Sequence, residues 1–126
     1  QKIILDIKKW TNSYLNERNK FLTKRDEINL KNFPIQPNGL FKQLRQVLPK
    51  NSAITLDAGT LCLQATDALK YYDPPSLFTP LDFGLVGFSF ACGLGVKIAK
   101  PKKTVVSLMG DGGFGMTISE LSTAVE

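Results

Sequence analysis

The 126-residue sequence contains no histidine. Without an imidazole these residues cannot form a Ser-His-Asp or Cys-His catalytic group, nor a zinc site that needs histidine ligands. Long apolar runs are missing as well. The longest, residues 83–96, contains four glycines and is shorter than the roughly 20 residues of a membrane-spanning helix. If the chain takes part in catalysis, a group other than imidazole must move the protons.

Cysteine is scarce, and the two that occur, Cys62 and Cys92, lie in apolar segments without C-x-x-C spacing. Such residues are typical of reduced core thiols in proteins of reducing compartments. The sequence also shows no signal-peptide pattern at its start. We therefore expect free thiols, a cytoplasmic location and no membrane partner.

The net charge of +5 is concentrated at one end of the chain. Residues 1–33 carry eight basic and four acidic side chains, whereas residues 34–126 carry eight basic and seven acidic ones. The excess therefore belongs to one segment, and the bulk of the chain is nearly neutral. A solvated helix face explains this pattern more simply than a nucleic-acid-binding surface, so we expect no nucleic-acid partner.

Hydrophobic spacing divides the chain into two parts. Apolar residues recur at helical steps over 3–22, which predicts an amphipathic helix, and the polar, proline-bearing stretch 23–38 predicts a linker. Beyond it, helices alternate with short apolar strands, which predicts an α/β fold with a mostly parallel sheet flanked by helices. The expected strands are 53–56, 77–79 and 104–109; the expected helices are 39–48, 61–71, one that closes at Pro101, and one that a Thr117–Glu120 capping box opens and that runs to Glu126. In the helix 39–48 we expect five side chains to face inward: Leu40, Phe41, Leu44, Val47 and Leu48.

Two of these strands end in turns that suit a ligand. In parallel α/β sheets ligands bind at the carboxyl ends of strands, and here residues 57–60 and 110–115 follow strands directly. The second turn fits the pattern G-x-G-x-x-G between a strand and a helix, which is typical of dinucleotide-binding folds. However, Asp111 lies inside it and would place a carboxylate beside the phosphates. Two like charges about 4 Å apart repel by roughly 4 kcal/mol at an effective dielectric constant of 20.

A divalent cation between the two charges makes the interaction favourable, and Mg²⁺ prefers one or two carboxylates together with phosphate oxygens. We therefore interpret the turn as a metal–diphosphate cradle. In it Asp111 binds the metal, and Gly112 and Gly113 offer backbone amides. A simple strand-to-helix turn without a ligand is the alternative.

Three segments together resemble a known family. Residues 110–114, followed by 116–124, resemble the start of the thiamine diphosphate motif in the cofactor-binding C-terminal domain of acetolactate-synthase-like enzymes. Residues 83–88 resemble the glycine-rich stretch beneath the thiamine, and residues 56–60 occur in the family's order too. The resemblance covers 34–126 and implies a thiamine diphosphate-binding fold that is incomplete at its C-terminus. Residues 1–33 resemble the helix and linker that arrive from a preceding domain.

The resemblance implies a role for each matching position. Asp111 would bind the Mg²⁺ that holds the diphosphate. The carbonyl of Gly84 would accept a hydrogen bond from the pyrimidine amino group, and Val86 would lie beneath the cofactor as the wedge that bends it into a V shape. These two residues are the expected catalytic positions, although valine is smaller than the family's usual wedge. The remaining expected cofactor contacts are Gly59, Thr60, Gly110, Gly112 and Gly113.

The resemblance also implies that parts of the site lie elsewhere. The family's motif continues to one or two asparagines some 25 residues after the aspartate, whereas this chain stops 15 residues after Asp111. The glutamate that activates the pyrimidine belongs to a pyrimidine-binding N-terminal domain of the same or a partner subunit. We therefore expect a piece of a longer protein, inactive alone and working as a homodimer or homotetramer.

The implied activity is decarboxylation of a 2-oxo acid and transfer of the acyl group to a second carbonyl, as acetolactate synthase does in branched-chain amino acid biosynthesis. Residues 78–84 also resemble sulfoacetaldehyde acetyltransferase, and a 2-oxo acid decarboxylase of the same superfamily is a further alternative. Two other classes stay open: a nicotinamide- or flavin-binding Rossmann domain, and a non-catalytic homologue that serves as a scaffold.

Overall fold

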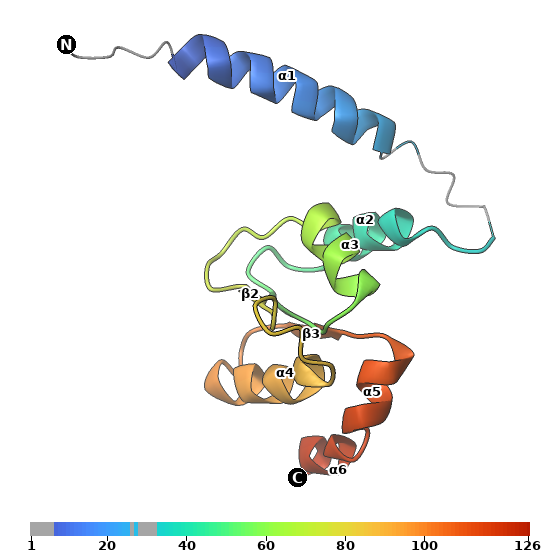
Figure 1. The fold of residues 1–126 in the computed structure, drawn as a ribbon. Coiled ribbons are helices and arrows are strands. Elements are labelled where there is room, and N and C mark those ends of the chain that lie inside the picture. Colours follow the sequence, from blue (N-terminus) through green and yellow to red (C-terminus); the bar gives the residue numbers. More distant parts are fainter. Residues whose placement is uncertain (1–6, 26, 28–32) are drawn as a thin grey trace. The chain divides into compact units, whose positions relative to one another are not determined.

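A computed structural model of the chain describes residues 7–25, 27 and 33–126. They fall into two compact units, Gln1–Gly39 and Leu40–Glu126, and each is described by itself. None of the helices in these described ranges is long and apolar enough to span a membrane. The elements in chain order are α1 (Ile7–Arg25), α2 (Pro37–Val47), β1 (Ala53–Leu56), α3 (Thr60–Ala68), β2 (Leu77–Phe78), α4 (Phe88–Ala99), β3 (Val105–Leu108), α5 (Asp111–Thr117) and α6 (Glu120–Val125) (Figure 1).

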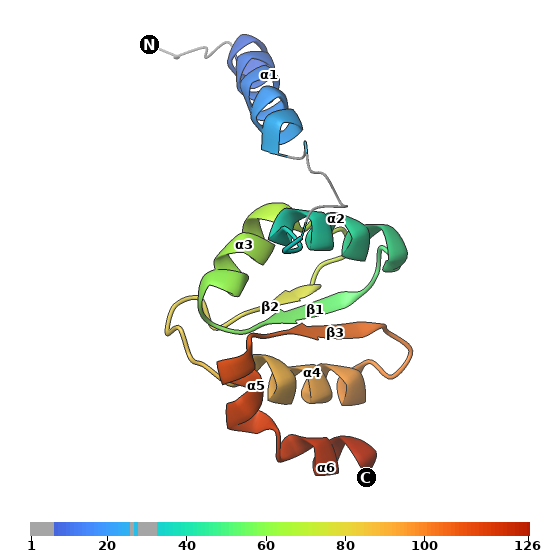
Figure 2. The same ribbon diagram turned by 90° about the vertical axis from the view of Figure 1, so that its right-hand side faces the viewer.

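The larger unit is built on a three-stranded parallel sheet in the order β2-β1-β3. Thr55 of β1 lies opposite Ser107 of β3, and Ile54 lies opposite Leu77 of β2. Figure 2 shows α2 and α3 over one face of this sheet and α4 over the other. The predicted α/β class, with a parallel sheet flanked by helices, is confirmed.

Strand β1 gives the two faces of the sheet opposite characters. Successive side chains of a strand point to opposite faces, so Ile54 and Leu56 share one face, and Thr55 and Asp57 share the other. Ile54 and Leu56 are fully buried in an apolar core. Four residues of the helices α2 and α3 and their flanks complete that core: Phe41, Cys62, Ala65 and Leu69.

The other face of β1 holds a buried cluster of hydroxyl groups beneath α4. The Thr55 hydroxyl lies within hydrogen-bond distance of the Ser89 carbonyl (2.8 Å) and of the Ser107 hydroxyl (2.8 Å), and the Ser89 hydroxyl donates to the Thr55 carbonyl (2.9 Å). Gly93 lies one turn after Ser89, and a Cβ there would overlap the Ser107 hydroxyl. Helix α4 therefore lies closer to the sheet than any larger side chain at Gly93 permits.

Helix α2 buries only part of its predicted apolar stripe. Phe41 is fully buried, and Leu44 and Leu48 are partly buried against the core. Leu40 is 50% exposed and Val47 75% exposed, so the prediction that they face inward is wrong. Phe41, Leu44 and Leu48 follow one another at steps of three and four, which places them on one stripe, and the other two residues flank it.

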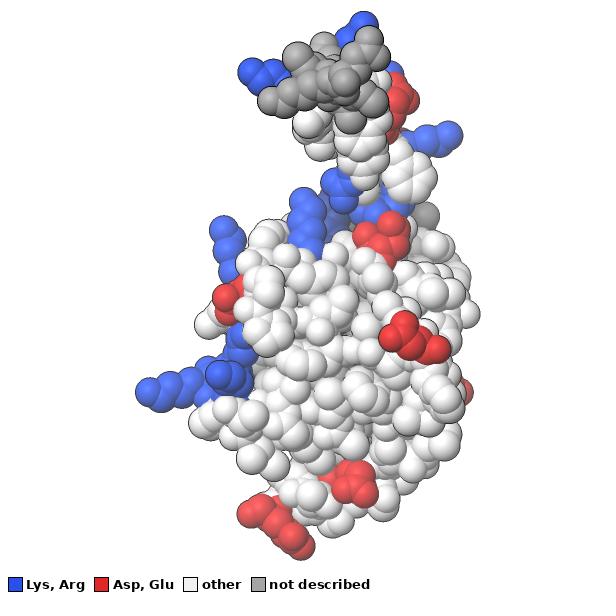
Figure 3. Space-filling model, turned by 60° about the vertical axis from the view of Figure 1, so that its left-hand side comes forward, with Lys and Arg blue, Asp and Glu red and all other residues white. Residues whose placement is uncertain are grey.

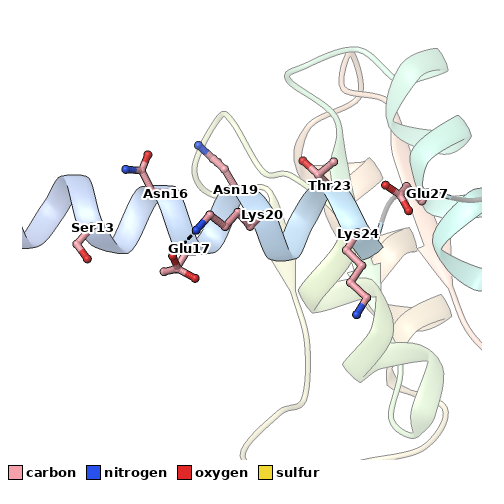
Figure 4. Close-up of a pocket in the computed structure, with 8 residues that line it drawn as sticks. All are labelled: Ser13, Asn16, Glu17, Asn19, Lys20, Thr23, Lys24 and Glu27. Atoms are coloured by element: carbon pink, nitrogen blue, oxygen red, sulfur yellow. Dashed lines mark hydrogen bonds and ion pairs between the residues drawn. The ribbon is translucent and has the colours of Figure 1, made fainter.

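Helix α1 of the smaller unit has no buried side chain. It runs three residues beyond the predicted end at residue 22, and the first part of the predicted helix, 3–6, lies outside the described residues. Trp10 and Tyr14 stack with ring centroids 5.7 Å apart. Figure 4 shows polar side chains of this helix pointing to different sides. Among them, the Lys20 ammonium contacts Glu17 Oε1 at 2.8 Å.

Two predictions near the C-terminus are wrong. Residues 110–115 were predicted as a loop, but from Asp111 onward they belong to the helix α5. The Thr117 hydroxyl donates to the Gly113 carbonyl one turn earlier (3.2 Å), so Thr117 closes α5 and does not cap the next helix. Helix α6 does begin at Glu120, but Ser119 before it is itself helical and makes no side-chain cap. Only two residues separate the end of β3 from the start of α5. The glycines of α5 disfavour a helix by propensity, and for that reason the sequence predicted a loop.

Candidate functional site

The strand-end turns meet at one edge of the sheet. Because β1 and β3 are parallel, Asp57 after β1 and Gly110 after β3 lie at the same edge. The segment that leads into α4, with Gly84 and Val86, reaches this edge as well, and Figure 2 shows all three segments at the left-hand end of the sheet. The structure therefore brings the predicted cofactor-binding positions to one end of the larger unit.

The start of helix α5 offers an open, acid-bearing surface. Gly110 precedes the helix, and Asp111 is its first residue with an exposed side chain. A Cβ at Gly110 or Gly112 would meet nothing within 4 Å, so this surface is free for a ligand. The first amides of a helix lack intrahelical partners and favour an anion. These residues fit a diphosphate, and the exposed carboxylate fits a cation that accompanies it.

One predicted donor of this surface already has a partner. The Gly112 amide donates to Asp111 Oδ1 at 2.9 Å. If Asp111 binds a cation and Gly112 binds a phosphate, this contact must be exchanged for the two ligand contacts. The sequence pattern did not reveal it, because both residues were expected to point at the ligand.

Gly113 differs from the other glycines of the turn. It is buried, and a Cβ at this position would overlap Oδ2 of Asp57. The absence of a side chain here is thus required by close packing between α5 and the end of β1. This is a structural requirement that the sequence analysis assigned wholly to phosphate binding.

Asp57 is the residue of this site that sequence reasoning missed. Its side chain is 2% exposed, and its two carboxylate oxygens accept hydrogen bonds from the amides of Gly87 (3.1 Å) and Ser89 (3.2 Å) at the start of α4. A signal for it was present in the sequence. An acid directly after a buried strand, on the same face as Thr55, must find partners inside the fold.

Gly59 and Gly84 line the same small cavity. It has a volume of about 160 Å³ and lies between the start of α3 and the loop that follows β2. Both glycines have positive φ (+90° and +63°), a backbone conformation that residues with a side chain rarely adopt. A Cβ at either position would point into open space. Thr60 is the exposed first residue of α3. The cavity is completed by Asp57, Ala58, Cys62, Leu63, Pro80 and Leu81.

The loop before α4 exposes apolar side chains next to this cavity. Val86 is 43% exposed, and Leu81, Phe83 and Leu85 are more exposed still. Val86 is therefore not a buried core residue of the larger unit. A wider groove, of about 990 Å³, lies at the opposite end of the sheet, around the end of α4 and the residues before β3.

The acidic side chains of the described residues do not gather into one metal-binding cluster. On the face shown in Figure 3, uncharged side chains cover most of the surface and the acidic side chains stand apart from one another. Within the described ranges, no three His, Cys, Asp or Glu side chains come together as a metal site. A cation at this edge would therefore have Asp111 as its acidic ligand from this part of the chain, and phosphate oxygens or further residues as the others.

A parallel α/β domain with glycine-rich, acid-bearing strand ends defines a cofactor-binding domain. Residues 57–126 match the family described as "thiamine pyrophosphate enzyme, C-terminal TPP binding domain". The chain belongs to this family, whose cofactor is thiamine diphosphate, also called thiamine pyrophosphate. The family recognised from the sequence is thereby confirmed, and the nicotinamide- or flavin-binding alternative loses its support.

The proteins that this chain resembles have several different activities. The chain is 37% identical over 99 residues to a probable acetolactate synthase large subunit of Methanocaldococcus jannaschii, which covers 74% of this chain and 17% of that protein. It is 31% identical over 91 residues to the sulfoacetaldehyde acetyltransferase of Castellaniella defragrans, covering 72% and 15%. The structure of a thiamine diphosphate-dependent 4-hydroxybenzoylformate decarboxylase from Rhodococcus jostii superposes with a TM-score of 0.64 at 23% identity, over 71% of this chain and 17% of that one.

The chain thus spans less than a fifth of the length of each of these proteins. The superposition supports the fold alone, because a sequence identity of 23% is too low to transfer the activity of that protein to this chain.

Proposed function

We propose that this chain is the diphosphate-binding part of a thiamine diphosphate- and Mg²⁺-dependent enzyme that decarboxylates a 2-oxo acid and transfers the acyl group to a second carbonyl. The observation that carries the proposal is the meeting of three segments at one edge of the sheet: Gly59 and Thr60, the loop 84–86, and the turn 110–113. All three segments lie within residues 57–126, the part of the chain that matches the family.

Each segment has a defined task in this proposal. The exposed Asp111 carboxylate holds Mg²⁺, and the amides of Gly112 and Gly113 with Gly59 and Thr60 hold the diphosphate. The Gly84 carbonyl orients the pyrimidine ring, while Val86 supports the cofactor from below. When bound, thiamine diphosphate would supply a nucleophilic carbon for the 2-oxo acid and a cationic ring that can take up the electron pair released with CO₂. The chain supplies shape, orientation and apolar cover, and this explains how it can serve catalysis without histidine.

Acetolactate synthesis is the activity that we favour within this class. The similarity to acetolactate synthase large subunits reaches 37% identity over 99 residues, against 31% over 91 for a sulfoacetaldehyde acetyltransferase. The two activities differ in the acceptor, a 2-oxo acid in one and phosphate in the other. Two parallel assays of the full-length protein distinguish them, one with pyruvate alone and one with sulfoacetaldehyde and phosphate. Acetolactate formed from pyruvate supports the proposal. Acetyl phosphate and sulfite formed from sulfoacetaldehyde, with no acetolactate from pyruvate, contradict it.

Calorimetry of the full-length protein tests the cofactor and the metal together. We expect thiamine diphosphate to bind in the presence of Mg²⁺ and to lose its affinity in EDTA, because the diphosphate charge then faces Asp111 without a cation. Binding that persists undiminished in EDTA contradicts the metal–diphosphate site. Tight, metal-dependent binding without any CO₂ release from 2-oxo acids supports instead the alternative of a non-catalytic scaffold.

Substitution of the metal ligand gives the sharpest single test. In Asp111→Ala we expect the affinity for thiamine diphosphate with Mg²⁺ to fall by at least about 100-fold. Substituting a residue that merely hydrogen-bonds to a metal ligand already lowers metal affinity about 10–100-fold. The unfolding temperature should stay near that of the wild type, because the Asp111 side chain is exposed. The control is Asp73→Ala, which removes an acid that is 55% exposed and forms an ion pair with Lys103. Wild-type cofactor affinity in Asp111→Ala contradicts the assignment.

A further inference from the structure

We propose that Asp57 is a positioning residue that sets the separation between the diphosphate-binding turn 110–113 and the thiamine-supporting loop 84–87. The inference rests on the proposed function and concerns a residue to which neither the family resemblance nor the comparisons assign a role. It follows from what the carboxylate touches on its two sides.

On one side Asp57 holds the start of α4. Its Oδ2 accepts from the Gly87 amide at 3.1 Å and its Oδ1 from the Ser89 amide at 3.2 Å. Gly87 directly follows Val86, the proposed support of the cofactor, and Gly84 lies three residues earlier. The hydrogen bonds therefore anchor the end of the thiamine-supporting loop to the end of β1.

On its other side Asp57 contacts α5. Gly113 approaches Oδ2 so closely that any side chain at that position would overlap it. Since Gly113 is also a proposed diphosphate contact, one carboxylate oxygen lies between the two groups of backbone atoms that would hold opposite parts of the same cofactor. The same two segments meet a second time, where a Cβ on Gly87 would lie 3.2 Å from Thr117 Cγ2 and 3.4 Å from Met116 Cβ of α5.

The burial of Asp57 makes this link stiff. A carboxylate that is 2% exposed needs its hydrogen bonds, because a buried charge without partners is strongly unfavourable. Asparagine has nearly the same shape but only one acceptor oxygen. Whichever way its amide turns, an NH₂ group then faces either the Gly87 or the Ser89 amide, and the loop must move away from α5.

A ligand that spans both segments should sense this movement, and a ligand that touches only one should not. We therefore compare the binding of thiamine diphosphate with that of inorganic diphosphate, both with Mg²⁺, to the full-length protein by calorimetry. In Asp57→Asn we expect the Kd of thiamine diphosphate to rise about tenfold, the effect of losing one hydrogen bond to a charged group. The Kd of inorganic diphosphate should change by less than about twofold.

The matched control is Asp73→Asn, the same chemical change in a side chain that is 55% exposed and pairs with Lys103, which should alter neither affinity. If Asp57→Asn does not fold, Gly87→Ala replaces it, since the added methyl would lie 3.2 Å from Thr117 Cγ2 of α5 and changes the same separation without altering a proposed diphosphate contact. Near-ultraviolet circular dichroism of the bound cofactor gives a readout besides affinity, and we expect an altered spectrum in the variant.

The outcomes separate this inference from the proposed function. An equal loss of affinity for both ligands, or no loss for either, in Asp57→Asn overturns the positioning role. If in addition Asp111→Ala abolishes binding of thiamine diphosphate, the proposed function stands and the positioning role alone is wrong. If Asp111→Ala binds thiamine diphosphate as the wild type does, the proposed function itself fails.

Discussion

The two faces of the β1 strand hold the larger unit together in different ways. On the α2 and α3 side, Ile54 and Leu56 join an apolar core that needs only volume and hydrophobicity. On the α4 side, Thr55 and Asp57 make hydrogen bonds of defined length to Ser89, Ser107 and the amides that begin α4. The apolar face accounts for stability, whereas the polar face fixes the position of the helix that follows the proposed thiamine-supporting loop.

The difference has a functional reason. Apolar contacts are tolerant of small shifts, because dispersion and burial depend weakly on direction. Hydrogen bonds weaken steeply when their angle or length changes. A helix that must hold a cofactor-contacting loop to within a fraction of an ångström is therefore better located by the second kind of contact.

The largest expected effect on stability comes from a substitution in the apolar core on the α2 and α3 side of the sheet. Phe41→Ala removes a fully buried ring from the core, and we expect the free energy of unfolding to fall by about 4 kcal/mol, the usual cost of such a truncation. Urea unfolding of the full-length protein measures it. The control on the same helix is Val47→Ala, which is 75% exposed and should change stability by less than about 0.5 kcal/mol. Similar losses in the two variants would contradict the division of α2 into a buried and an exposed side.

A smaller effect sharpens the polar face. Gly93→Ala brings a methyl group into the space of the Ser107 hydroxyl, so we expect a loss of about 2 kcal/mol from overpacking. Ser107→Ala in the same chain should recover part of that loss, because it removes the obstructing oxygen.

The matched control is Gly95→Ala, two residues further along α4, where a Cβ meets nothing within 4 Å. Here we expect a gain of up to about 1 kcal/mol, the helix preference of alanine over glycine. A neutral Gly93→Ala, measured by the same urea unfolding, would show that α4 does not rest on the sheet as closely as described.

The smallest effect concerns proton binding at the edge of the apolar face. Burial, with a smaller contribution from Cys62, raises the pKa of Tyr71 from 10.0 to about 12. The folded protein thus holds this proton more tightly than the unfolded chain. The stability that this provides is complete below pH 10 and is lost as the pH rises towards 12. Comparing the ultraviolet titrations of wild type and Tyr71→Phe should show a phenol that ionises near pH 12, and a titration near pH 10 would contradict it.

Much of the fold followed from sequence patterns, because they depend on local spacing. Alternating helices and short apolar strands were sufficient for the parallel α/β class, and the apolar segments around Ile54 and Val106 coincide with β1 and β3. The α5 helix was missed because three of its seven residues are glycines, which disfavour helices by propensity. Leu40 and Val47 were misassigned because helical spacing alone leaves the width of a buried stripe open.

The residues of the proposed site also fall into those found from short motifs and those found only from tertiary contacts. Asp111 and the glycines around it, Gly59, Gly84 and Val86 were identified from short motifs, and their roles remain predictions that the binding experiments test. Asp57 was passed over because its significance arises from partners 30 and 32 residues away, at Gly87 and Ser89. The requirement for glycine at position 113 also depends on Asp57 and is invisible in either segment by itself.

The sequence by itself determined the family, the α/β class and the residue types at the strand ends, because these depend on motifs and periodicity within short segments. Only the tertiary structure decided which groups touch: that Thr55, Ser89 and Ser107 form one hydroxyl cluster, and that Asp57 lies between the two proposed cofactor-binding segments. Such contacts join parts of the chain that are distant in sequence. Their geometry is set by the parallel register of β1 and β3 and by the close approach of α4 and α5, and neither has a local signature.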